Sequence, residues 1–180
     1  DYLVYGGIYR AVNLRIQGSL HIAHSHARPR IYSFGNGASD VRTKEVAEAK
    51  GLSSCKAALA VEVELSQPFI AANSPGAVSP GTVAPGSSAL SIKGRLLRLG
   101  ACLVEVSRTI SEPNSNAQPC NLNFPPLEGI IPWDIENPAL YDLELTLFLD
   151  GEQIDQVHNR IGFREARFTP EGFFLNGKRL

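Results

Sequence analysis

Two carboxylates, Asp134 and Glu136, are separated by one residue in a polar segment that precedes the proline at position 138. A pair of carboxyl groups can divide the work of acid–base catalysis when their surroundings make one keep its proton and the other release it. Nothing in this segment separates the two carboxyls in that way. We therefore predict that neither is catalytic, and we expect no catalytic residue in this chain.

Three histidines, His21, His24 and His26, lie within a stretch of six residues. Imidazole is a common zinc ligand. On a strand, however, His24 and His26 would point to one face and His21 to the other, and the nearest acidic residue downstream is Asp40. We therefore treat the three as weak candidates for metal ligation, expect exposed polar side chains, and predict no metal and no cofactor.

The three cysteines, Cys55, Cys102 and Cys120, are too few and odd in number for a disulfide framework. Cys102 and Cys120 fall on the apolar phase of alternating segments, which predicts buried, reduced thiols. Reduced cysteines favour the cytoplasm, and nothing else in the sequence indicates a compartment.

Composition excludes two classes of partner. The chain has 17 Lys and Arg against 18 Asp and Glu, without a basic run that could follow phosphates, so nucleic acid is not expected. No apolar run approaches the ~20 residues that a membrane span needs, so no membrane contact is expected. Hydrophobic residues make up 43% of the chain, which is enough for a globular core.

The main secondary-structure signal is alternation of apolar and polar residues, which predicts strands with one face on a core. It is clearest over residues 141–149, where tyrosine and leucine alternate with polar side chains. The other alternating segments are residues 12–16, 59–65, 102–106 and 120–124. Several such strands separated by turn residues predict an all-β fold, an antiparallel β-sandwich.

Turn residues stand between these segments. Asp150-Gly151 and Asn176-Gly177 are typical of two-residue hairpin turns, because glycine accepts positive φ without steric cost. Residues 98–100 are expected to reverse the chain between residues 92–97 and 102–110. The alternation changes phase between Ile154 and Ile161, which predicts a β-bulge.

Several motifs follow one another in the last part of the chain. They are Ile-Pro-Trp at 131–133, Asn-Pro-Ala-Leu-Tyr at 137–141, Asp-Gly at 150–151, Ile-Gly-Phe-Arg at 161–164 and Phe-Leu-Asn-Gly-Lys at 174–178. Their order resembles the second, immunoglobulin-like domain of the family 2 glycoside hydrolases, which include β-galactosidases and β-glucuronidases. Tyr-Gly-Gly-Ile-Tyr-Arg at 5–10 resembles the end of the jelly-roll domain that opens these enzymes, with Ala11 in place of the usual acidic residue.

The resemblance implies a division of the chain. Residues 1–18 would be the terminal strand of the jelly roll and a linker, residues 19–39 a linker, and residues 40–180 an immunoglobulin-like β-sandwich ending where the catalytic barrel would begin. It also implies a first sandwich strand over residues 41–46, although local propensity favours a short helix capped by Asp40. The Pro-, Gly- and Ser-rich residues 68–88 are expected to form a long exposed loop.

The resemblance further implies a parent enzyme, most similar to a β-galactosidase, that hydrolyses terminal non-reducing β-D-galactosides with retention. Its two catalytic glutamates would lie on the barrel, the acid/base after an asparagine, and this chain has no Asn-Glu dipeptide. The chain would therefore be an inactive piece. Its expected partners are the jelly-roll and barrel domains of the same polypeptide, with glycoside bound through the parent and loop 68–88 as a candidate oligomer contact.

Six residues are expected to pack between domains: Tyr9, Arg10, Trp133, Phe163, Arg164 and Asn176. Trp133 would pack under the loop that enters the strand at Tyr141 or against a neighbouring domain. Gly162 would allow close backbone approach, and Arg164 would bind a carboxylate between domains.

An independent β-sandwich module for carbohydrate binding or adhesion is the alternative interpretation. Sugar-binding modules present exposed aromatic platforms, because flat apolar rings stack on sugar faces. One tryptophan and five tyrosines, mostly on core phases or in the motifs above, are a poor platform.

Overall fold

The computed structural model describes residues 16–35, 54–67, 89–110 and 119–180. Several predictions lie outside these residues. They concern the strand at residues 12–16 except for Ile16, the packing of Tyr9 and Arg10, the helix or strand at residues 39–51, and the loop at residues 68–88.

The described residues form strands arranged in three antiparallel sheets. The first sheet has the order β1-β2-β5, with β6 also paired to β2, and the second has the order β4-β3-β7-β8. The strands of these two sheets are β1 (Ile22–Gly35), β2 (Ser54–Leu65), β3 (Leu90–Arg98), β4 (Ala101–Ile110), β5 (Cys120–Asn123), β6 (Leu127–Ile130), β7 (Tyr141–Leu149) and β8 (Glu152–Ile161). The third sheet consists of β9 (Ala166–Thr169), β10 (Gly172–Leu175) and β11 (Lys178–Arg179). We call this three-stranded sheet the C-terminal hairpin.

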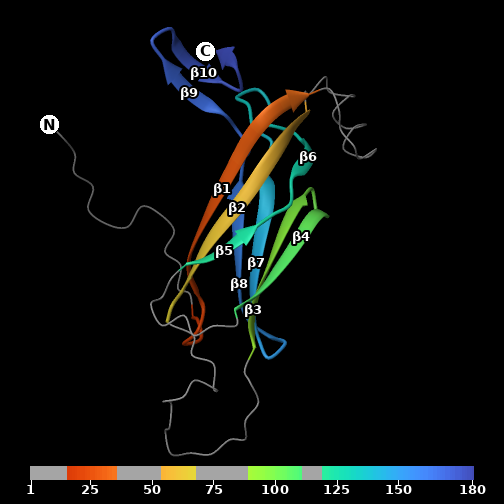
Figure 1. Ribbon diagram of the computed structural model, residues 1–180, viewed down its shortest axis with the longest axis vertical. Coiled ribbons are helices and arrows are strands. Elements are labelled where there is room, and N and C mark those ends of the chain that lie inside the picture. The colour runs from red at the N-terminus through yellow and green to blue at the C-terminus, as the bar shows by residue number, and fades with distance from the viewer. Residues whose placement is uncertain (1–15, 36–53, 68–88, 111–118) are drawn as a thin grey trace, which may run out of the picture.

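The two larger sheets face each other as the layers of a sandwich, and the C-terminal hairpin projects beyond one end (Figure 1). This arrangement confirms the predicted all-β, antiparallel sandwich. The alternating segments at residues 59–65, 102–106 and 141–149 lie in strands, and so does the segment at residues 120–124 except for Phe124.

The prediction of a linker over residues 19–39 is wrong for Ile22–Gly35, which forms β1 and pairs with β2 along its length. β1 ends the order of the first sheet, so one of its edges has no strand partner among the described residues. An edge strand tolerates Pro29 and needs few apolar residues, which removes the alternation that marks a central strand. Side chains join β1 to the other sheet: Asp155 accepts a hydrogen bond from the Ile22 amide at 2.8 Å, and Asn159 donates to Ser25 at 2.7 Å.

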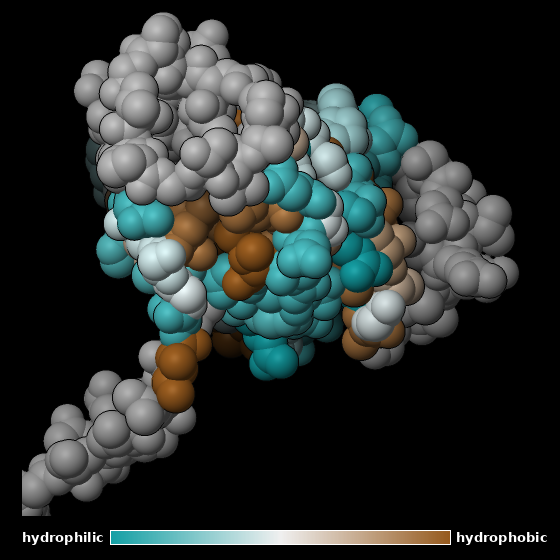
Figure 2. All heavy atoms as spheres, turned by 90° about the horizontal axis from the view of Figure 1, so that it is seen from below, coloured by the Kyte–Doolittle hydropathy of each residue, from teal (hydrophilic) through white to brown (hydrophobic). Residues whose placement is uncertain are grey.

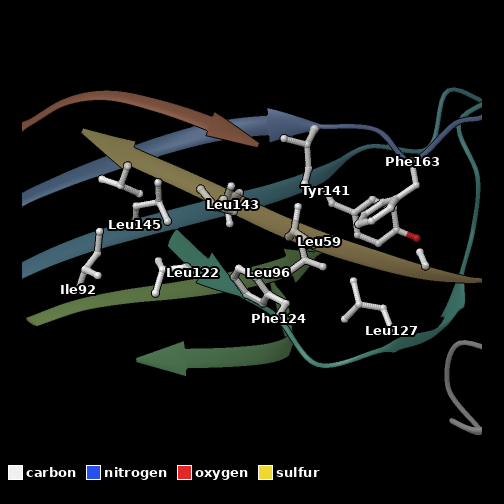
Figure 3. Packing of buried hydrophobic residues seen from close by; sticks show 14 of the residues in the cluster. Leu59, Ile92, Leu96, Leu122, Phe124, Leu127, Tyr141, Leu143, Leu145 and Phe163 are labelled. Carbon is white, nitrogen blue, oxygen red and sulfur yellow. The ribbon is translucent and has the colours of Figure 1, made fainter. Parts of the chain in front are cut away.

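The core lies between the two sheets. Leu59 and Leu122 from the first sheet pack between the layers with Ile92 and Leu143 from the second (Figure 3). At one end of this core the rings of Tyr141 and Phe163 meet edge to face, with centroids 5.2 Å apart. Burial of these apolar side chains is the main force that holds the layers together.

Tyr141 is 1% exposed, yet its hydroxyl is satisfied inside the core. It accepts a hydrogen bond from the Ile131 amide at 2.8 Å and donates to the Ile131 carbonyl at 3.3 Å. Burial raises the pKa of Tyr141 above its ordinary value of 10.0, which keeps the phenol protonated and able to donate. The side chain thereby ties the start of β7 to the segment that follows β6.

The predicted turns and the bulge are confirmed. Three two-residue turns have positive φ at both positions: Leu99 at 49° and Gly100 at 80°, Asp150 at 52° and Gly151 at 84°, and Asn176 at 50° and Gly177 at 77°. Such turns match the twist of the strands they join. The pairing of β7 with β8 shifts by one residue at Ile154, where the alternation changes phase.

Cys55 and Cys120 are buried as free thiols, but the prediction that Cys102 is buried is wrong. Cys102 lies on β4, which is exposed or half-buried throughout and ends the order of its sheet. The register between β3 and β4 also shifts between Leu96 and Leu97, next to Cys102. Alternation therefore predicts the wrong face for this thiol.

We predict that Cys102 reacts first with a thiol reagent in the native chain, followed much later by Cys55 and Cys120. Burial raises the pKa of Cys55 from 9.0 to about 11 and also raises that of Cys120, and the thiolate is the reactive form. Stability contributed by the neutral Cys55 thiol is present below pH 9.0 and is lost as the pH rises toward about 11. Mass spectrometry of peptides after timed alkylation measures the order, and equal rates would contradict it.

Gly94→Ala should destabilise the sandwich. A Cβ at this position of β3 would lie 2.9 Å from Cζ of Phe124, within the contact between the two sheets. We expect a loss of about 1–3 kcal/mol in the free energy of unfolding, as overpacked cores show, measured by urea denaturation. Gly18→Ala is the matched control, because its Cβ would meet only the Leu20 carbonyl at 3.9 Å. Equal midpoints for both variants would refute the close approach of the sheets at Gly94.

Candidate functional site

Four of the residues selected from the sequence come together at the end of the sandwich that carries the hairpin. The Trp133 amide donates to the Phe163 carbonyl at 2.7 Å, and the Asn176 side chain donates to the Trp133 carbonyl at 2.8 Å. The Arg164 guanidinium lies over the Trp133 ring, 5.4 Å from its centroid. We call Trp133, Gly162, Phe163, Arg164 and Asn176 the Trp133 joint.

Gly162 confirms the predicted close approach. A Cβ on this residue would lie 3.2 Å from the Trp133 Cβ and 3.4 Å from two indole carbons. The absence of a side chain therefore lets the segment after β6 pack directly on the chain that leaves β8. Two backbone segments about thirty residues apart in sequence are joined in this way.

A pocket of about 380 Å³ opens on the outer side of the joint. It is lined by Pro29, Trp133, Leu140, Gly162 and Arg164. Leu140 is 42% exposed and the nearby Ile135 of the same segment is 61% exposed. The pocket thus combines apolar surface with one cation, which suits an apolar side chain flanked by a carboxylate better than a highly polar ligand.

The roles of the predicted packing residues differ. Phe163 is fully buried in this domain's own core, so its predicted packing between domains is wrong. Its ring packs against Tyr141 in the core. A sequence motif does not show whether such a ring faces the core or a neighbouring domain. Within the described residues Arg164 lies over Trp133 and pairs with no carboxylate.

Asn176 makes three hydrogen bonds within the chain. Its side-chain amide donates to Trp133, its side-chain oxygen accepts from the Glu165 amide at 3.0 Å, and its own amide donates to the Glu165 carbonyl at 2.8 Å. The residue therefore holds the C-terminal hairpin to the sandwich from inside. The Asn-Gly pair predicts the turn at residues 176–177, but no sequence pattern predicts these hydrogen bonds.

Asp134 and Glu136 lie in the turn that follows Trp133. The Asp134 carboxylate accepts a hydrogen bond from the Ile135 amide at 2.7 Å, and the Asp134 amide donates to the Asn137 carbonyl at 3.0 Å. Glu136 is exposed. These bonds stabilise the turn that follows Trp133.

The histidines lie on and beside β1. His24 and His26 share one face, as predicted, opposite Glu64 and Glu62 of β2. With Arg28, which forms an ion pair with Glu62, they line a pocket of about 350 Å³. His21 instead donates from Nδ1 to the Gly18 carbonyl at 2.8 Å. Among the residues that the structure describes, no three His, Cys, Asp or Glu side chains gather as metal ligands would.

The outer face of the second sheet carries ion pairs across its strands. Glu105 pairs with Lys93 at 3.2 Å, and Glu144 pairs with Arg95 at 3.1 Å and approaches His158 at 3.7 Å. Exposed pairs of this kind contribute little to stability and keep a face soluble. Seen from the end opposite the hairpin, the described surface is also mostly hydrophilic, with apolar side chains near its middle (Figure 2). None of the described residues forms a helix suited to crossing a membrane.

Residues 86–164 match the family described as Glycosyl hydrolases family 2, which confirms the resemblance identified from the motifs. The chain is 29% identical to a β-galactosidase of Rhizobium meliloti over 185 residues, which is 100% of this chain and 18% of that protein. It is 46% identical to a β-glucuronidase of Bacteroides fragilis over 46 residues, which is 25% of this chain and 7% of that protein. The chain therefore spans less than a fifth of the length of either relative.

A solved β-glycosidase from Bacteroides vulgatus is similar in structure. The TM-score is 0.59 over 91% of this chain and 16% of that chain, at 19% sequence identity. Similarity at this identity concerns the fold alone. Together with the sheet order, it confirms an immunoglobulin-like antiparallel β-sandwich.

Proposed function

We propose, from the family 2 match over residues 86–164, that this chain is a non-catalytic immunoglobulin-like domain of a β-glycosidase. Its task is to hold a neighbouring domain of the same polypeptide in place. The neighbour docks on the outer side of the Trp133 joint, where it fills the pocket beside Leu140 and pairs a carboxylate with Arg164.

The pocket at the joint is the observation that carries this proposal. It combines an exposed apolar side chain, Leu140, with a cation, Arg164, that has no carboxylate partner among the described residues. Domain interfaces use such surfaces, with an apolar centre and arginine at the contact. The outer face of the second sheet, by contrast, is covered by ion pairs that already satisfy its charges.

The proposed reaction of the parent enzyme is hydrolysis of terminal non-reducing β-D-galactosides with retention. The relative aligned over the whole chain is a β-galactosidase, which supports this substrate. A β-glucuronide is the second candidate, because the relative with 46% identity is a β-glucuronidase. Retention requires two carboxyl groups about 5–5.5 Å apart. We place them outside this chain, since Asp134 caps a local turn and Glu136 is exposed.

An independent carbohydrate-binding module is the competing proposal. A sugar platform needs an open aromatic face, whereas the Trp133 ring has the Arg164 guanidinium over it. Binding of the chain to a glycan array that is lost in Trp133→Ala would favour this alternative.

We predict that the purified chain hydrolyses neither nitrophenyl β-galactoside nor nitrophenyl β-glucuronide, because it lacks the paired carboxyls. The enzyme expressed from the gene with its flanking coding sequence should cleave the galactoside. Initial rates of nitrophenol release measure both. Turnover by the chain alone that disappears in Asp134→Asn or Glu136→Gln would contradict the non-catalytic role.

If a neighbouring domain docks at the joint, Arg164→Ala should lower the free energy of unfolding more in the parent enzyme than in the chain alone. In the chain it removes a cation–π contact of about 0.5–1 kcal/mol, and in the parent it also leaves the neighbour's carboxylate unpaired. Thermal unfolding and limited proteolysis of both proteins measure the difference. Lys93→Ala, on the ion-pair face of the second sheet, is the matched control and should cost the same in both. An equal cost for Arg164→Ala would refute docking at this site.

A further inference from the structure

The C-terminal hairpin is a separate structural unit. Its three strands form a sheet of their own, which shares no ladder with either layer of the sandwich in the described residues. The rings of Phe168 and Phe173 lie 4.8 Å apart, but Phe168 remains 82% exposed. A sheet of this size has little stability by itself, so its direction depends on how it is attached to the sandwich.

Asn176 provides a hydrogen bond in that attachment, next to Leu175 of β10, which is 4% exposed. In the described part of the chain, its side-chain amide provides the hydrogen bond that crosses from the hairpin to the Trp133 carbonyl. Trp133 is itself fixed, because its amide donates to the carbonyl of Phe163, whose ring is buried in the core. The hydrogen bond therefore links the hairpin to the rigid interior rather than to a surface loop.

We infer that Asn176 is a positioning residue whose amide sets the direction in which the hairpin leaves the sandwich. The hairpin presents the exposed Phe168 and Leu180, so fixing its direction also fixes where this apolar surface lies. The neighbouring bond from Glu165 to the Asn176 oxygen holds the side chain in the orientation that the Trp133 carbonyl requires.

The residue type fits this task better than those at the equivalent turns. Position 176 needs a positive φ of 50°, which asparagine accepts more readily than most side chains. It also needs a donor and an acceptor on one short side chain, and only the amide supplies both without a hydroxyl rotor. Asp150 holds the same turn position, but its side chain only accepts, from the Ala89 amide, and Leu99 is 88% exposed.

Asn176→Asp separates positioning from turn formation. The carboxylate still accepts from the Glu165 amide but repels the Trp133 carbonyl, so the link across the joint is lost while the hairpin remains. Residual dipolar couplings of the labelled chain should fit one alignment tensor for sandwich and hairpin in the wild type, and two in the variant. The fluorescence emission maximum of Trp133, the single tryptophan of the chain, should also shift in the variant. The thermal midpoint of the sandwich should not change.

Two further variants complete the test. Asn176→Gly keeps the positive φ and loses both side-chain bonds, so the hairpin should reorient and the Glu165 amide should also lose its protection from hydrogen exchange. Leu99→Asp places the same carboxylate at the same position of another turn and should leave a single tensor. A single tensor in both Asn176 variants would overturn the inference, and so would loss of cross-strand protection within β9 and β10, which would assign Asn176 to hairpin folding instead. Every readout comes from this chain alone and is independent of the substrate of the parent.

Discussion

The hydroxyl of Tyr141 is the contact on which the rest of this end of the molecule depends. It lies in the core and binds both the amide and the carbonyl of Ile131. A buried amide left without a partner costs about 1–3 kcal/mol, so the segment after β6 has one favourable place, against the start of β7. That segment carries Trp133, and fixing its first residue brings the indole beside the chain that leaves β8.

The position of Trp133 makes further contacts possible. Gly162 gives Trp133 room, because a Cβ there would lie only 3.2 Å from the Trp133 Cβ. The Phe163 carbonyl then accepts a hydrogen bond from the Trp133 amide. The Trp133 carbonyl is left to Asn176, and through it to the hairpin. The contacts run from the buried Tyr141 to the C-terminal sheet, so they connect the core to a sheet that pairs with neither layer of the sandwich in the described residues.

The sequence predicts those features that a local pattern determines. Alternation locates β7 because that strand is covered along its inner face, and Asp-Gly or Asn-Gly locates the turns because few residues accept positive φ. Prediction from the sequence fails where a neighbouring strand determines how a residue is placed. β1 is an edge strand with little apolar periodicity, and Cys102 lies next to a register shift that the sequence of β4 does not show. Leu99 adopts positive φ without being a usual turn residue, since the flanking strands and Gly100 impose the turn.

Four of the motif residues lie together in the structure, but their contacts differ from one another. Order and spacing select Trp133, Phe163, Arg164 and Asn176, but a motif does not indicate which way a side chain faces. Phe163 and Asn176 face inward and make bonds within the domain, whereas Arg164 remains beside the pocket with Leu140. This division has a physical use. In the docking that we propose, the surface would lose less entropy on binding, because the inward contacts already hold the side chains around the pocket.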